Sequence, residues 1–270
     1  MIRAFKNLYR LIKELYSDRR LLVSLSKKDF RRKFAGSYLG VIWAFLQPAL
    51  TVLVYCIVFQ FAFPGSNTDG VPFVVWFLPG IVLWLFISEA ISISSSAYLE
   101  YSYLVKKVAF SIGILPMVKV LSSFITHLCF VVLVEAILMA YGIFPTLFFL
   151  QFPYYSICTL VFVYAVALLL SSIMVFFRDL GQIISLLLLV GMWGTPIAWH
   201  MGILSKTAQK VLSLNPVYYL VEGYRDSFLG RGWFTEKPEL TFLFWSVSCV
   251  LLLIGANLYR RLKPHFADVL

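Results

Sequence analysis

Charged residues are scarce in this sequence of 270 residues. Asp, Glu, Lys and Arg make up 13% of the chain and hydrophobic residues 61%, and residues 36–68 carry no charge at all. A typical soluble domain has about 25% charged residues. The composition therefore excludes an ordinary soluble domain and favours a membrane protein.

The sequence also lacks the motifs that mark nucleotide, metal and nucleophile sites. It contains neither a GxxxxGKS/T nor a GxGxxG motif, so no site for ATP hydrolysis is recognisable in it. Its four cysteines show no CxxC spacing, and its three histidines lie far apart. We expect no catalytic residue, no metal and no cofactor bound by this chain, and no nucleic acid partner.

Six apolar segments are candidates for membrane-spanning helices. A helix needs about 20 apolar residues to cross the hydrocarbon core, and five of the segments meet that standard, the sixth being shorter. They lie near 37–63, 71–97, 112–141, 152–177, 180–204 and 241–259. The predicted fold class is an all-α membrane protein with six transmembrane helices. The sequence GMWGTP (191–196) makes a break in the fifth helix as plausible as a bend.

Basic residues gather on one side of these spans. Residues 1–33 hold eleven Lys and Arg against three acids, whereas residues 64–70 and 142–151 contain no Lys or Arg. By the positive-inside rule, this asymmetry predicts that both termini are cytosolic and that the number of crossings is even.

The first 34 residues are expected to form cytosolic helices at the membrane surface, before a permease domain over 35–265. In 2–16, Phe5, Leu8, Ile12 and Leu15 share one helical stripe, and Asp18 is a candidate cap for a second helix. A basic arm attracted to anionic lipid and a surface helix that also contacts a cytosolic partner both fit this pattern.

Residues 205–240 form the only sizeable segment on the opposite side of the membrane. Asn215 and Pro216 are a typical helix start, with Asn as N-cap and Pro in the first turn. The following VYYLVEGYRDSFL is too apolar for a loop and too short to cross. We predict a re-entrant or interfacial helical hairpin.

Charged residues inside predicted spans are costly and face protein or water. Glu89 and Lys119 lie at similar distances from the inner ends of spans two and three. We predict an ion pair between them, with a structural role favoured over a role in transport. Glu135, in the outer half of span three, has Arg225 as its candidate partner.

Aromatic residues make up 17% of the chain. Belts at the two membrane interfaces explain many of them. A path for sugar rings, which stack on flat aromatic faces, is the alternative use.

Several blocks of the sequence resemble one transporter family. These are DFRRKFAGSYLGVIWAFLQPAL (29–50), YLVKKVAFSIGILP (103–116), VFFRDLGQI (175–183), TPIAW (195–199) and LNPVYYLVEGYRDSFL (214–229). In this order they resemble the type-2 ABC exporter permeases that move polysaccharides and polyol phosphates. DGVPFVVWF (69–77), the last of these blocks and the ending HFADVL look most like the branch that exports wall teichoic acid, and O-antigen permeases share the first signature and FRD. Ser111-Ile112 departs from the family's usual Phe-Pro.

The resemblance implies a permease without an ATPase site. Two copies would form a channel at their interface, with two separate ATP-binding cassette subunits that bind ATP and Mg. The expected cargo is wall teichoic acid linked to undecaprenyl diphosphate. The alternatives are O-antigen or another lipid-linked polysaccharide, or a small solute. A membrane-embedded glycosyltransferase is disfavoured because the acids are scattered.

The resemblance also assigns roles to individual residues. Arg31, Arg32 and Lys33, with Tyr38 and Trp43, would form a gate that meets the lipid diphosphate, although Arg31 to Lys33 are equally explained by topology alone. Residues 98–110 would be the coupling helix on the ATPase, and the outer segment would close the channel. The coupling residues are Tyr101, Tyr103, Leu104, Lys106 and Lys107, and the outer gate residues are Tyr218, Tyr219, Glu222 and Arg225.

Overall fold

The computed structural model describes residues 2–62, 67–107 and 111–270. Within these ranges the chain is predominantly helical, as the apolar composition predicts. The extended residues form a short hairpin, with β1 (Asn67–Thr68) antiparallel to β2 (Val71–Pro72). Asp69 and Gly70 both have positive φ, as the two central residues of a tight hairpin turn require. The predicted class, an all-α membrane protein, is confirmed.

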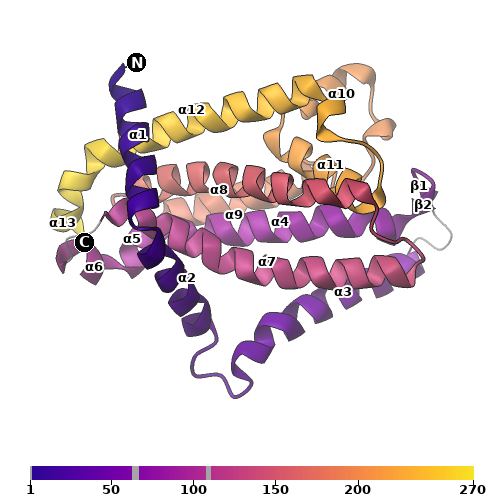
Figure 1. The fold of residues 1–270 in the computed structure, drawn as a ribbon, viewed down its shortest axis with the longest axis horizontal. Helices are drawn as coiled ribbons and strands as arrows, with labels where there is room; N and C mark the ends of the chain where they lie inside the picture. The colour runs from indigo at the N-terminus through magenta and orange to yellow at the C-terminus, as the bar shows by residue number, and fades with distance from the viewer. Residues whose placement is uncertain (1, 63–66, 108–110) are drawn as a thin grey trace.

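Four long helices run side by side along the long axis of the molecule (Figure 1). They are α4 (Phe73–Ser95), α7 (Leu115–Ala140), α8 (Phe152–Met174) and α12 (Pro238–Leu262). Four helical segments in the described ranges, each containing one of these helices, are long and apolar enough to cross a membrane. Two further predicted spans correspond to α3 (Trp43–Ala62) and α9 (Leu180–Trp193), whose apolar stretches are shorter.

Helix α4 forms the centre of the bundle. It is apolar on every side over most of its length, and 83% of its most apolar 18-residue window is buried. A helix that is apolar on every side is buried in a protein core or spans a membrane, and α4 is largely enclosed by other helices. Helices α3, α7, α8, α9 and α11 (Pro216–Leu229) all contact it. Side chains that point outward from α4 therefore lie between helices.

The two ends of the bundle differ. One end carries both chain termini together with α1 (Ile2–Ser17), α2 (Arg19–Lys33), α5 (Ala97–Glu100), α6 (Ser102–Lys107) and α13 (Phe266–Val269), and we call it the terminal end. The other carries the β-hairpin, with α10 (Lys206–Ser213) and α11 towards it, and we call it the hairpin end. Short 3-10 turns join the helices at Gly40–Ile42, Ile112–Ile114, Leu147–Gln151, Met201–Ile203, Phe234–Glu236 and Lys263–His265.

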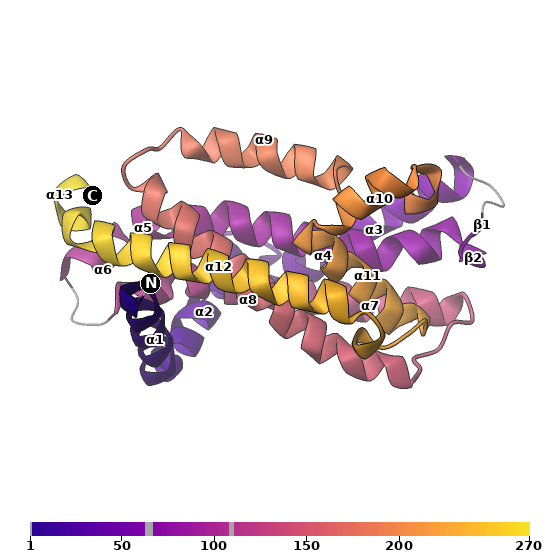
Figure 2. The ribbon, with the colours of Figure 1, turned by 90° about the horizontal axis from the view of Figure 1, so that it is seen from above.

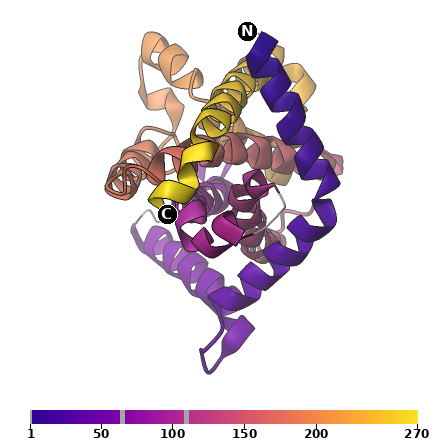
Figure 3. The same ribbon diagram turned by 90° about the vertical axis from the view of Figure 1, so that its left-hand side faces the viewer.

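The amphipathic helix α1 forms where the sequence predicts it, and part of its predicted apolar stripe packs against the bundle. Leu11 is buried, and Leu8 and Leu15 pack against the same cluster beside α12. Phe5 and Ile12, which belong to the same predicted stripe, are 56% and 55% exposed. Figure 3 shows α1 and α2 along one edge of the terminal end. Asp18 stands at the start of α2, but its side chain makes no capping hydrogen bond.

The fifth predicted span is broken where the sequence indicates. Helix α9 ends at Trp193, inside the GMWGTP segment, and Thr195 to His200 form no helix. Figure 2 shows α9 along one side of the bundle. Several of its apolar side chains are exposed, as are many on α3.

The outer segment folds into two helices joined by a short turn. Asn215 caps α11, its side-chain oxygen accepting a hydrogen bond from the backbone of Val217 at 3.0 Å, and Pro216 occupies the first turn. Helix α11 packs against α4 and α8. The predicted pair of helices is therefore present, and its re-entry into the membrane stays a prediction.

Candidate functional site

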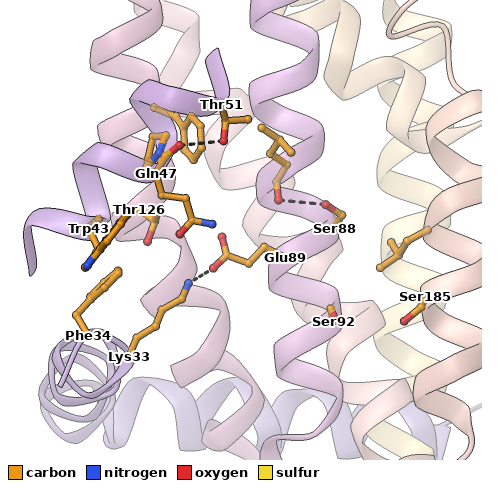
Figure 4. Close-up of a pocket in the computed structure, with 15 residues that line it drawn as sticks. Lys33, Phe34, Trp43, Gln47, Thr51, Ser88, Glu89, Ser92, Thr126 and Ser185 are labelled. Atoms are coloured by element: carbon orange, nitrogen blue, oxygen red, sulfur yellow. Dashed lines mark hydrogen bonds and ion pairs between the residues drawn. The ribbon is translucent and has the colours of Figure 1, made fainter. Parts of the chain in front are cut away.

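A cavity of about 460 Å³ lies between the end of α2 and helices α3, α4, α7 and α9. We call it the Glu89 pocket, and Figure 4 shows the side chains around it. Its polar lining residues are Lys33, Trp43, Gln47, Thr51, Ser88, Glu89, Ser92, Thr126 and Ser185. Phe34, Pro48, Leu85, Phe130 and Leu188 are among the apolar ones. The pocket therefore brings polar side chains from several helices together beside apolar ones.

The lining of the Glu89 pocket carries one positive and one negative charge. Lys33, the last residue of α2, forms an ion pair with Glu89 of α4. The two side chains are 35% and 30% exposed, and both point into the pocket, as does the amide of Gln47 (Figure 4). Lys33 is thus already paired with a carboxylate.

Three hydroxyl groups of the pocket donate to their own helices. Thr51 Oγ1 donates to the carbonyl of Gln47 at 2.9 Å, Ser88 Oγ to that of Leu85 at 3.2 Å, and Ser185 Oγ to that of Gly181 at 3.0 Å. Each of these oxygens keeps only its acceptor capacity for the cavity. The indole of Trp43, which is 38% exposed, lies at one wall.

The other predicted gate residues lie beside this pocket. Arg31 and Arg32 are exposed in the last turn of α2, and Tyr38 is fully exposed in the turn before α3. Arg32 and Lys33 also line a smaller cavity of about 280 Å³ with Asp29, Glu100 and Lys119. The structure therefore brings Lys33 and Trp43 to the Glu89 pocket and leaves Arg31 and Tyr38 outside its lining.

A cluster of Asp29, Glu100, Tyr101 and Lys119, here called the Lys119 cluster, joins three elements at the terminal end. Lys119 Nζ is 2.8 Å from Asp29 Oδ1 of α2 and 2.6 Å from Glu100 Oε2 of α5. The Tyr101 hydroxyl donates to the same Asp29 oxygen at 2.6 Å. Although burial alone would raise the pKa of Asp29, the hydrogen bonds from Lys119 and Tyr101 hold that pKa below its ordinary value.

The predicted Glu89–Lys119 ion pair does not form. Helix α7 begins only at Leu115, after the 3-10 turn at Ile112–Ile114, so Lys119 lies about one turn inside it, beside α5. Glu89 faces Lys33 instead. Sequence reasoning missed Asp29 because it lies in a basic helix outside the spans, where an acid suggests only solvent exposure.

The predicted coupling residues fall into three groups. Tyr101 is buried in the Lys119 cluster, which corrects its expected place on a docking surface. Tyr103 is exposed, and Leu104 is half-buried. Lys106 and Lys107 end α6, and their side chains lie outside the part of the chain that the structure describes.

At the hairpin end, Arg225 anchors α11 to α4. Its guanidinium lies 3.5 Å from the centre of the Trp76 ring, and its nitrogens donate to Glu222 at 2.6 Å and to the carbonyl of Ile197 at 2.9 Å. Arg225 is fully buried, and its predicted partner Glu135 is not among these contacts. The pairing with Glu135 was wrong because Arg225 points towards α4 and the loop after α9.

The remaining residues predicted for an outer gate are also packed. The Tyr219 hydroxyl lies 3.0 Å from both the Tyr154 hydroxyl and Thr241 Oγ1. Tyr218 and Glu222 are half-buried. These contacts hold α11 closely against α8 and α12.

A sequence model of a membrane protein family described as ABC-2 type transporter matches residues 20–229, which is most of the chain. The chain belongs to the ABC-2 type transporter family. The match spans the Glu89 pocket, the Lys119 cluster and α11. The resemblance seen in the sequence blocks is therefore confirmed at the level of the family.

Relatives of this ABC-2 type transporter chain match it over nearly its full length. It is 30% identical over 261 residues to an O-antigen export system permease protein, RfbA, of Myxococcus xanthus, covering 96% of this chain and 98% of the relative. It is 23% identical over 251 residues to a protein of the same name from Klebsiella pneumoniae, covering 93% and 95%. These relatives are named as permease proteins of export systems. They favour the O-antigen alternative over the teichoic acid branch.

Proposed function

We propose that this chain is the membrane-spanning permease subunit of an ATP-driven exporter of lipid-linked polysaccharide of the O-antigen type. The observation that carries the proposal is the full-length similarity to O-antigen export permeases, joined to a polar pocket beside a basic surface helix. Wall teichoic acid linked to undecaprenyl diphosphate is the second candidate cargo. The similarity of residues 69–77 and 214–229 to that branch supports it.

The working assembly contains two copies of this chain and two ATP-binding cassette subunits, which bind ATP and Mg. The exposed apolar side chains of α3 and α9 suit either lipid or a second copy, and a channel between two copies would be bordered by these helices. Both termini are cytosolic in this proposal, which places the terminal end on the ATPase side. The chain crosses the bacterial cell membrane six times.

The exposed end of α2 is where a lipid diphosphate would first contact the chain. Arg31 and Arg32 are solvent-accessible there, and a guanidinium can bind two phosphate oxygens at once. Lys33 and Trp43 lie next to them in the Glu89 pocket, where the saccharide would follow. Tyr103 and Leu104 of α6 supply accessible surface for the ATPase, and the Lys119 cluster joins that region to α2.

Reconstitution tests this function directly. The chain is co-purified with its ATP-binding cassette partner and placed in liposomes loaded on one side with undecaprenyl-diphosphate-linked polysaccharide. We expect ATP-dependent appearance of the polysaccharide on the opposite side, and loss of that transport when Arg31 and Arg32 are both changed to Gln. Lys210→Gln, at an exposed position on α10, is the matched control. Transport of teichoic acid but not of the O-antigen type polymer would reverse the choice of cargo.

A further inference from the structure

The charges of the Glu89 pocket cancel each other. Lys33 and Glu89 are the only charged residues in its described lining, and they form an ion pair. A phosphate group brought into this space would have to displace the carboxylate of Glu89 from Lys33. It would then remain beside that carboxylate, and two like charges within a few ångströms repel each other.

The hydrogen-bonding groups of the pocket include both donors and acceptors. The amide of Gln47 and the indole of Trp43 carry N–H donors. The hydroxyls of Thr51, Ser88 and Ser185 donate to backbone carbonyls and present lone pairs to the cavity. The carboxylate of Glu89 is acceptor-only, and Lys33 reaches one of its oxygens. Such a surface suits a ligand that can both donate and accept hydrogen bonds. Sugar hydroxyl groups do both, whereas a phosphodiester group can only accept.

We propose that Glu89 makes this pocket selective for an uncharged sugar chain over an anionic polyol phosphate chain. The inference rests on the proposed function and decides between its two candidate cargos. Glu89 accepts sugar hydroxyls and excludes phosphate, Lys33 holds the carboxylate in place, and Trp43 offers a flat apolar face to the ring. The lipid diphosphate stays outside, at Arg31 and Arg32.

Binding to the full-length chain in lipid nanodiscs tests the selectivity. Two probes of equal length are compared by calorimetry, a neutral oligohexose and an oligoglycerol phosphate. The wild-type chain should bind the neutral probe at least tenfold more tightly. Glu89→Gln should weaken neutral binding and strengthen anion binding, because Lys33 is released, so that the ratio falls to about threefold or less. Lys33→Gln should keep the preference and weaken anion binding further.

Opposite effects of the two variants on the anionic probe cannot come from a general loss of folding. Glu239→Gln, which makes the same chemical change at an exposed position on α12, should leave the ratio unaltered. Tighter binding of the anionic probe by wild type, or an unchanged ratio in Glu89→Gln, overturns the inference. If ATP-driven export of polysaccharide persists in that case, only the selectivity has failed. If export also fails, the proposed function falls with it.

Discussion

At the scale of single residues, Lys119 is a buried cation of the terminal end with two carboxylate partners. The two carboxylates belong to different helices. Removing one partner of a buried ion pair leaves an uncompensated charge and costs about 3–5 kcal/mol. We expect Lys119→Met to lower the thermal unfolding temperature strongly in detergent, whereas Lys210→Met, at an exposed position, should not change it. Adding Asp29→Asn to Lys119→Met should restore part of the loss.

The Asp29 carboxyl also predicts a dependence on pH. Its pKa is lowered in the folded chain, against the opposing effect of burial, so the unfolded state binds its proton more readily. The stabilisation from this group is complete above the unfolded pKa of about 3.9 and is lost as the pH falls through the lower folded pKa. The difference in unfolding temperature between wild type and Asp29→Asn should therefore be constant from pH 5 to 7 and shrink below about pH 4. A difference that grows on acidification would contradict this assignment.

Gly223 is required by close packing of α11 on α8. A Cβ atom at this position would lie 2.0 Å from Cε1 of Tyr155, a buried ring that cannot move freely. Overpacking of this kind costs about 1–3 kcal/mol or more. We expect Gly223→Ala to lower the unfolding temperature. Gly181→Ala, in α9, meets only Met174 at 3.6 Å and should be neutral or slightly stabilising.

At the scale of elements, the attachment of α11 depends on the geometry of one side chain. The fork of Arg225 bonds to Glu222 and to the carbonyl of Ile197 while stacking on Trp76. Lysine keeps the charge but lacks the planar fork. Hydrogen–deuterium exchange should show faster uptake in α11 and in residues 195–200 for Arg225→Lys, with α12 unaffected. Arg231→Lys, at a half-buried position nearby, is the control. A uniform rise across all helices would mean general destabilisation instead.

Elements whose signals are local could be predicted from the sequence, and pairings between elements could not. Asn215 and Pro216 start α11, and the glycines and proline of 191–196 end α9, because each acts on its own backbone. The partners of Glu89 and Lys119 depend on which faces of α4, α7 and α2 meet. The depth of a residue along its helix does not determine which neighbouring helix its side chain faces. The 3-10 turn before α7 and the packing of α2 on α7 determine which residues pair with Glu89 and Lys119.

The Glu89 pocket illustrates the same limit. Its lining comes from the end of α2 and from four further helices, and its hydroxyl residues are common in membrane helices. Trp43 and Lys33 were predicted at a gate because they lie within a family signature. Nothing in the sequence marks Gln47, Ser88 and Ser185 as pocket residues, because their place in the pocket depends on which helices pack beside their own.

At the scale of the whole molecule, both termini lie at one end of the bundle, as an even number of crossings requires (Figure 1). Helices α3 and α9 have the shortest apolar stretches and decide that number. If only the four longer segments crossed, the number would still be even, but α3 and α9 would leave both their ends on one side. The side of the membrane on which the loops beside α3 and α9 lie therefore distinguishes four crossings from six, whereas the positions of the termini do not.

Fusions to alkaline phosphatase, which is active only outside the cytosol, report the side of the membrane on which those loops lie. With six crossings, fusions after Gly142 and after Ile203 should be active, and fusions after Arg178 and Leu270 inactive. Fusions to a fluorescent protein that folds only in the cytosol should give the inverse pattern. The physical reason for this orientation is the distribution of positive charge. Basic residues lie at 1–33 and at Arg178, whereas 142–151 contain no Lys or Arg. Equal phosphatase activity after Arg178 and Ile203 would show that α9 does not cross, and it would remove α9 from the wall of the proposed channel.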